Sequence, residues 1–367
     1  MGKAFLFLAC LVLATQAVDN DPEIEMNAPE IIERWGYPVE IHTVETTDGY
    51  LIDIHRIPAG KNQVQTPNKP VVFMQHGFMC DSSNWIVNLP DQSAGFLFAD
   101  AGYDVWLGNV RGNTYGKKHK TLNPKSEKFW EFSFDEHAAI DLPNEIDYVL
   151  QKTGQKSLNY IGHSQGTLTM FAHLSEDQTF VSKIQNFFAL APIGTMTHAL
   201  YVLFGSGEFL PSNNFMKVIS KDFCGTNPTN DYCDNLLFLI SGPESTQFND
   251  TRVAVYTSQT PAGEKFDYQD PKKNQKKYGQ DTPPAYDYSK VNAPTHLFWG
   301  DQDYLGDPMD IKNFLIPTLK PEFVKTNVEL KNYNHMDFIW GLSTPTDVYA
   351  PILKTIQASN QGRFQRH

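Results

Sequence analysis

The chain has 367 residues, of which 41% are hydrophobic and 20% are charged, and its formal net charge is −12. This composition is that of a folded protein with a sizeable core and excludes a disordered chain. An acidic surface disfavours nucleic acid and anionic membranes, so we expect neither as a partner.

The first 17 residues have the pattern of a secretory signal peptide. Lys3 provides a positive charge, residues 4–14 form an apolar run, and Thr15-Gln16-Ala17 offers a cleavage site. The alternative is an N-terminal core helix. The run is too short to span a bilayer, so we expect cleavage after Ala17, export through the secretory pathway and no transmembrane segment.

The elements that follow predict an α/β fold. The segment around Asp48-Gly49 alternates polar and apolar residues, which predicts a hairpin. Ser133 and Glu136 fit a capping box that opens a helix with an apolar face extending to Leu150. Strands alternating with helices imply a mostly parallel sheet with helices on both faces. The short apolar runs that predict its buried strands are 70–74, 103–107, 158–161, 187–191, 296–299 and 328–330.

The region 195–290 breaks this alternation. We interpret it as a cap inserted between a first core part, 18–194, and a second core part, 291–367. Cys224 and Cys233 flank a turn-rich loop that a disulfide could close, and Asn249 lies in a glycosylation sequon. Cys80 is left unpaired, and we interpret it as a small buried residue.

Ser164 is the candidate nucleophile. It lies in Gly162-His163-Ser164-Gln165-Gly166, between a predicted strand and a predicted helix. Small residues two before and two after the serine let the strand and the helix approach closely, which exposes the hydroxyl at the carboxyl end of the sheet. The alternative is a tight turn without chemistry, but the strand–turn–helix context favours the nucleophile.

His335 is the candidate base. A serine hydroxyl needs a base, and on such folds the acid and then the base follow the serine in the chain. His335 lies in a loop just after the last predicted strand. The other histidines after Ser164 fit less well, because they fall on the following helix, before the expected acid, within a strand or at the terminus: His173, His198, His296 and His367.

Asp303 is the candidate acid. Asp301 and Asp303 both follow the strand at 296–299. The loop must reach beyond the strand end to orient His335, which favours Asp303 over Asp301. The acid would hold the imidazole in one tautomer and stabilise the imidazolium.

Two backbone N–H groups are candidates for the oxyanion hole. One belongs to Gln165, the residue after the nucleophile, and the other to Phe78. His76-Gly77 precedes Phe78 and lets the backbone turn close to the site, although the same dipeptide would also end a strand in an ordinary way.

With these residues identified, the chain resembles the acid lipases, the family of gastric lipase and lysosomal acid lipase within the α/β-hydrolase superfamily. The similar stretches run nearly end to end and include "QHGFMCDSSNWIVNLP", "AGYDVWLGNVRGNTY", "IGHSQGT" and "YNHMDFIWG". The resemblance implies the α/β-hydrolase fold, the triad of Ser164, Asp303 and His335, the oxyanion groups of Phe78 and Gln165, and a Cys224–Cys233 disulfide.

The resemblance also implies the activity. Such proteins hydrolyse triacylglycerols or cholesteryl esters at a lipid–water interface, at acid pH and without a cofactor. They act in lysosomes or outside the cell, including the gut lumen. We see no sequence pattern of metal ligands.

The chain departs from the family in one place. After "YTSQTPAG" the family continues with a longer, aromatic-rich cap segment, whereas here the short polar "EKFDYQDPKKNQKKYGQD" follows. Two rival interpretations therefore stay open. One is a lipid-binding protein on the same fold with impaired catalysis, and the other is a soluble carboxylesterase of small esters.

Overall fold

The computed structural model describes residues 21–193, 272, 275 and 285–364. The expected signal peptide, the Cys224–Cys233 pair, Asn249 and almost all of the expected cap lie outside these described residues. Among the helices in the described ranges, none combines the length and hydropathy that a bilayer span needs.

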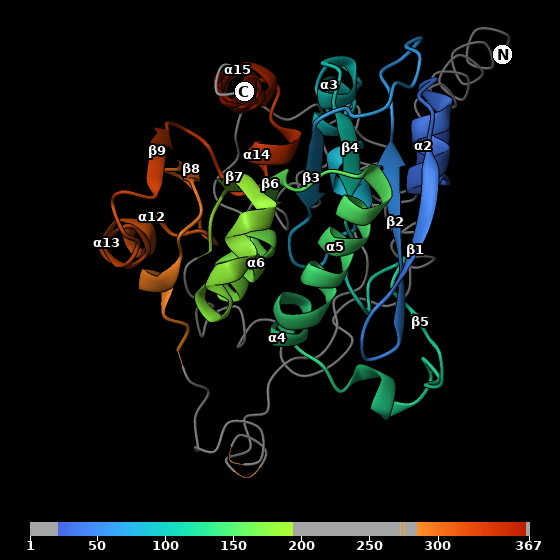
Figure 1. Cartoon of the computed structure of the whole chain (residues 1–367), viewed down its shortest axis with the longest axis horizontal. Helices are drawn as coiled ribbons and strands as arrows, with labels where there is room; N and C mark the ends of the chain where they lie inside the picture. The colour runs from blue at the N-terminus through green and yellow to red at the C-terminus, as the bar shows by residue number, and fades with distance from the viewer. Residues whose placement is uncertain (1–20, 194–271, 273–274, 276–284, 365–367) are drawn as a thin grey trace, which may run out of the picture.

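The described strands form one mixed sheet in the order β1-β2-β4-β3-β6-β7-β8-β9, with β5 paired to β2. The pairs from β4 to β9 are parallel, whereas β2 is antiparallel to β1, β4 and β5. The expected mostly parallel α/β sheet is therefore confirmed (Figure 1). The strands are β1 Glu40–Glu45, β2 Tyr50–Ile57, β3 Val71–Gln75, β4 Asp104–Leu107, β5 Lys118–His119, β6 Leu158–His163, β7 Ile184–Leu190, β8 Thr295–Gly300 and β9 Val324–Leu330.

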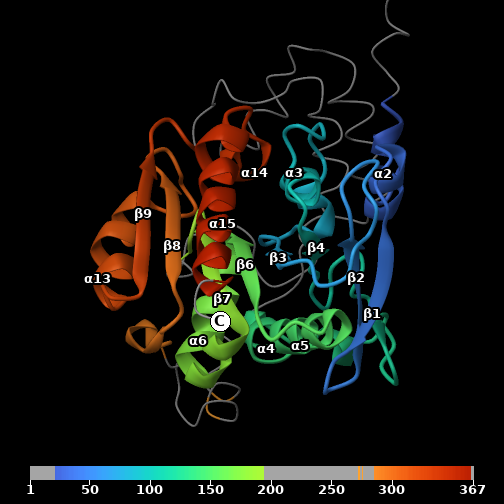
Figure 2. The same ribbon diagram turned by 45° about the horizontal axis from the view of Figure 1, so that its top comes forward.

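Helices cover both faces of the sheet. Figures 1 and 2 show α5 and α6 on one side and α3, α14 and α15 on the other. The α-helices are α2 Ala28–Arg34, α3 Ala94–Asp100, α4 Phe134–Glu136, α5 Leu142–Thr153, α6 Gln165–Glu176, α12 Pro308–Asp310, α13 Ile316–Thr318, α14 Asp337–Trp340 and α15 Ala350–Phe364. The 3₁₀ turns are η1 Pro22–Ile24, η2 Ser82–Trp85, η3 Glu127–Trp130, η5 Gln178–Lys183 and η8 Tyr288–Lys290, and the π-helical turns are η4 His137–Asp141, η9 Ile311–Leu315 and η10 Pro345–Tyr349.

Two apolar clusters, one on each face, form the core. Successive residues of a strand point to opposite faces, so Val72 and Met74 of β3 enter one cluster while Val71 and Phe73 enter the other. All five residues of β3 and all six of β6 are buried. The central strands are therefore fixed on both faces, and their carboxyl ends form a rigid base for the loops that follow them.

The capping box at Ser133 is present as expected. The Ser133 hydroxyl accepts from the Asp135 N–H, and the Glu136 carboxylate accepts from the Ser133 N–H at 2.7 Å. The helix then widens into the π-helical turn η4 before α5. Pro143 has no N–H to donate to the preceding turn. The side chain of the next residue, Asn144, donates to the Ile140 carbonyl at 2.6 Å.

Candidate active site

Ser164 lies on a strained turn between the central strand β6 and α6. Its φ of 53° and ψ of −121° are unusual for a residue with a side chain. The Ser164 N–H donates to the Leu190 carbonyl at 3.0 Å, which ties the turn to the end of β7. This hydrogen bond helps to hold the serine in its strained conformation. Such strain is typical of functional positions.

Close backbone packing explains the small residues around this serine. A Cβ on Gly162 would lie 2.7 Å from the Gly166 carbonyl, and a Cβ on Gly166 would lie 2.4 Å from the Gln75 carbonyl. The strand, the helix and the end of β3 therefore approach more closely than any other residue type allows. The sequence pattern reflects a real steric requirement.

His335 and Asp303 form a buried pair. His335 Nδ1 lies 3.0 Å and 2.9 Å from the two Asp303 oxygens, and both side chains are almost fully buried. Asp303 Oδ1 also accepts from the N–H groups of Leu305 and Gly306, at 2.9 and 2.7 Å. A carboxylate held in this way keeps the proton on Nδ1, which leaves Nε2 of His335 as an acceptor.

His163 connects this pair to the serine, and the sequence reasoning had not singled it out. Its ring centroid lies 4.9 Å from that of His335, and its Nε2 lies 3.0 Å from the His335 carbonyl oxygen. Because a carbonyl only accepts, Nε2 carries the proton. Burial, and then the neighbouring His335, hold the pKa of His163 well below its ordinary value. The residue before Ser164 therefore fixes the loop that carries the candidate base.

The loop after β3 passes directly over the serine. A Cβ on Gly77 would lie 2.9 Å from the Ser164 Cβ and 3.4 Å from its Oγ. Phe78 follows in the chain and is half-buried, whereas Gln165 begins α6 and is buried. The structure thus brings the segments of both candidate oxyanion donors next to Ser164.

Two of the histidines that fit the base less well lie in the described residues, and neither is in the loop that carries His335. His173 is on α6 and His296 is within β8, as expected. Asp301 accepts from the Asn332 N–H at 2.7 Å and pairs with Lys331 at 3.5 Å instead of contacting His335. Cys80 is a free thiol and is half-buried, whereas we expected a small buried residue.

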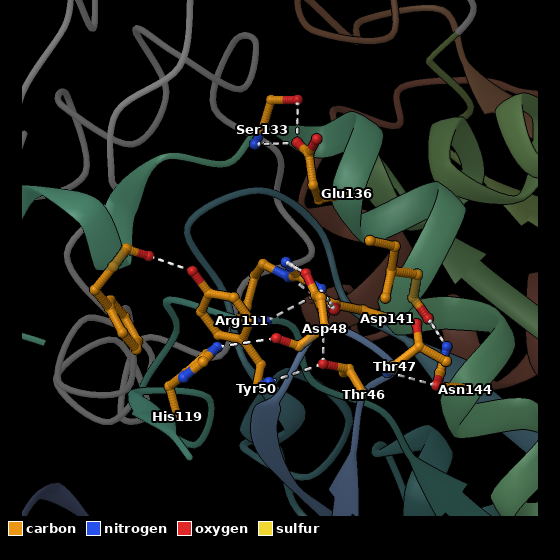
Figure 3. A network of polar contacts seen from close by, with 12 residues as sticks. Thr46, Thr47, Asp48, Tyr50, Arg111, His119, Ser133, Glu136, Asp141 and Asn144 are labelled. Atoms are coloured by element: carbon orange, nitrogen blue, oxygen red, sulfur yellow. Dashed lines mark hydrogen bonds and ion pairs between the residues drawn. The ribbon is translucent and has the colours of Figure 1, made fainter. Parts of the chain in front are cut away.

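Arg111 anchors the loop after β4, which borders the site. Its guanidinium donates to Asp141 at 2.8 and 2.7 Å and to Asp48 at 2.6 and 2.9 Å, and it lies 4.1 Å from the Tyr50 ring centre. Figure 3 shows Arg111 together with Asp48 and Asp141. Since Asp48 lies on the β1–β2 turn and Asp141 ends η4, one side chain fixes three segments.

In the described part of the chain no cluster of three or more His, Cys, Asp or Glu residues could hold a metal ion.

A serine on a strand–helix turn at the carboxyl edge of a mostly parallel sheet defines the α/β-hydrolase class. Two family models match accordingly: the alpha/beta hydrolase fold over residues 70–342 and a partial alpha/beta-hydrolase lipase region over residues 28–89. A solved structure from Sulfolobus solfataricus shares the fold, with a TM-score of 0.59, 14% identity and coverage of 87% of this chain and 94% of that chain.

Curated relatives narrow this class. Lipase lipl-1 of Caenorhabditis elegans is 51% identical over 94% of this chain and 96% of that protein. Gastric triacylglycerol lipase of Bos taurus is 40% identical over 96% of this chain and 94% of that protein. Lysosomal acid lipase/cholesteryl ester hydrolase of Homo sapiens is 39% identical over 97% of this chain and 99% of that protein. The chain belongs to this family of α/β-hydrolase lipases, as the sequence motifs predict.

The same alignments bear on chain length. The alignment with lipl-1 spans 389 positions, more than the 367 residues of this chain, so that relative holds residues that this chain lacks. That the shortening falls in the cap stays a prediction.

Proposed function

We propose that the chain is a lipase that hydrolyses the esters of neutral lipids, with Ser164 as nucleophile, His335 as general base and Asp303 as the acid that orients His335. The observation that carries this proposal is the buried Asp303–His335 pair, at 2.9 Å, whose loop contacts His163, the residue before the strained Ser164. A hydrogen-bonded carboxylate, an imidazole with an unprotonated Nε2 and a strained serine are the parts that acyl transfer needs.

The reaction follows from these positions. His335 Nε2 takes the proton of the Ser164 hydroxyl as the oxygen attacks the ester carbonyl. The N–H groups of Phe78 and Gln165 stabilise the oxyanion, and His335 returns the proton to the leaving alcohol. Water then attacks the acyl-enzyme, with His335 again as base, and releases the fatty acid.

The substrate class and location are proposed from the relatives. Their names specify triacylglycerol for the gastric protein and cholesteryl esters for the lysosomal protein. We propose that this chain takes one or both of these lipids at a lipid–water interface. With the signal-like N-terminus, those names also support a lysosomal or extracellular location.

The test is fatty-acid release from emulsified triolein and cholesteryl oleate between about pH 4 and pH 8, with dissolved p-nitrophenyl butyrate as a small ester. We expect release from at least one emulsion and loss of nearly all release in Ser164→Ala, because only about 10³–10⁴-fold catalysis over water survives without a triad member.

Two other outcomes would replace the proposal. Turnover of p-nitrophenyl butyrate without turnover of either emulsion would make the chain a small-ester carboxylesterase. A folded wild type that hydrolyses none of the three esters would favour lipid binding without catalysis.

A further inference from the structure

We propose that Asn113 is a positioning residue for the oxyanion hole, because it fixes the tautomer of His76 and His76 in turn holds the Gly77–Phe78 peptide. This inference rests on the proposed function, since it assigns a role in the same site. It concerns the "GNVRGNTY" segment, in which Asn109 and Asn113 lie on either side of Arg111.

The orientation of the Asn113 amide is fixed by groups that can only donate. The Tyr115 N–H donates at 3.0 Å to the Asn113 atom that must therefore be Oδ1. The Ser82 N–H likewise donates at 2.9 Å to Asn109, which identifies Asn109 Oδ1. The atom of Asn113 that lies 2.9 Å from Asn109 Oδ1 is thus the nitrogen, and both amides have one orientation.

The tautomer of His76 follows from this orientation. Asn113 Nδ2 directs its second hydrogen at His76 Nε2, at 3.1 Å, so Nε2 must be the unprotonated nitrogen. His76 Nδ1 lies 2.7 Å from the Gly77 carbonyl, which can only accept, so Nδ1 must carry the proton. Both ends of the ring therefore require the same neutral tautomer.

The Gly77 carbonyl belongs to the same planar peptide as the Phe78 N–H. In a trans peptide the two groups point in opposite directions, and the described chain contains no cis peptide bond. Holding the carbonyl on the His76 side therefore directs the Phe78 N–H away from His76. Gly77 itself lies against Ser164, so this peptide sets one donor beside the nucleophile.

The surroundings keep His76 in this state. It is 3% exposed, and burial lowers its pKa to about 4, with the Gly77 contact acting in the opposite direction and His137 adding to the lowering. His163 is the other titratable group that interacts with it, and burial lowers its pKa too. A neutral ring with one fixed proton is a rigid support for the peptide.

The test compares kcat and KM for p-nitrophenyl butyrate in wild type, Asn113→Leu, His76→Phe and the double variant. Removing an oxyanion donor costs about 10²–10³-fold in kcat, so a donor that is only loosened should cost about 10–100-fold, with KM within about twofold. Because the two residues act in series, the double variant should lose no more than His76→Phe alone.

A matched control exists at the other end of the sheet. Asn186 donates to Asn159 at 2.8 Å and contacts His296 at 3.3 Å, which is a second buried Asn–Asn–His group. Asn186→Leu should lower the thermal midpoint of unfolding about as much as Asn113→Leu does, but it should leave kcat unchanged. Wild-type kcat in a folded Asn113→Leu variant, or additive losses in the double variant, would overturn the proposal.

The tautomer gives a readout that does not depend on activity. Long-range ¹H–¹⁵N spectra of histidine-labelled protein should show His76, assigned by its absence in His76→Phe, protonated on Nδ1. Asn113→Asp keeps the Oδ1 acceptor but replaces the donor with a carboxylate, so it should place on Nε2 a proton that the wild type lacks. An Nε2 proton in the wild type would overturn the relay even if the chain proved to be inactive on every ester.

Discussion

Asp301 and Asp303 are separated by one residue, yet their surroundings predict opposite roles. Asp303 is buried against His335, whereas Asp301 is partly exposed and pairs with Lys331. We expect Asp303→Asn to lower kcat by about 10⁴-fold, because the amide favours the wrong imidazole tautomer. Asp301→Asn is the control and should stay within a few-fold of wild type in the same ester assay. Equal losses in the two variants would contradict the assignment.

At this scale, the sequence predicts residue types and their order better than it predicts proton positions. Motif, order and strand position indicate Ser164, Asp303 and His335. The sequence indicates His76 only as a turn residue and indicates no role for His163 or Asn113. Their roles depend on which ring nitrogen faces which partner. The contact of His76 with Gly77 is local, but those of His76 with Asn113 and of His163 with His335 join segments far apart in the chain.

At the scale of elements, the turn at Ser164 depends on close backbone approach. A Cβ on Gly166 would meet the Gln75 carbonyl at 2.4 Å, a backbone atom that cannot move aside cheaply. We expect Gly166→Ala to destabilise the fold by about 1–3 kcal/mol and to lower kcat as well.

Gly154 provides the control for this substitution. It has a φ of +69° and nothing within 4 Å of an added Cβ. Gly154→Ala should cost about 1–2 kcal/mol through its backbone alone and leave kcat intact. Urea unfolding and ester turnover measured on both variants check this, and a fully active Gly166→Ala would contradict the steric account.

Strands were predicted well where both faces are buried and less well at the edge. The predicted run at 158–161 lies within β6, which is buried throughout. The predicted run at 328–330 covers only the end of β9, Val324–Leu330, in which exposed and partly exposed residues alternate in the first half. Edge strands lack the continuous apolar run that identifies a central parallel strand.

At the scale of the whole molecule, buried histidines couple stability to pH. Burial lowers the pKa of His55, His76 and His296 to about 4 and that of His137 to about 3. Between pH 6.5 and pH 4 the unfolded chain therefore binds more protons at these sites than the folded chain does. Their contribution to stability is complete above pH 6.5 and is lost as the pH falls towards 4.

His296→Gln isolates one of these contributions. Burial is the main cause of the His296 shift, and nearby Lys325 adds to it. Glutamine does not titrate, so the wild type should lose about 2 kcal/mol relative to the variant between pH 7 and pH 4.5. Urea unfolding at the two pH values measures this difference. If the difference in free energy of unfolding between wild type and variant is the same at both pH values, His296 is not held neutral. Buried carboxyls with a raised pKa, such as Glu145, change stability in the opposite direction, but they do so equally in both proteins.

The most direct test of the whole account is covalent labelling with a p-nitrophenyl alkylphosphonate, which traps an activated serine. Wild type should take up one equivalent, found by peptide mass spectrometry on Ser164, with one equivalent of nitrophenol released. Ser164→Ala should take up none, and His335→Gln should react far more slowly. Labelling of a different residue, or undiminished fatty-acid release by Ser164→Ala, would contradict the central claim that Ser164 is the nucleophile.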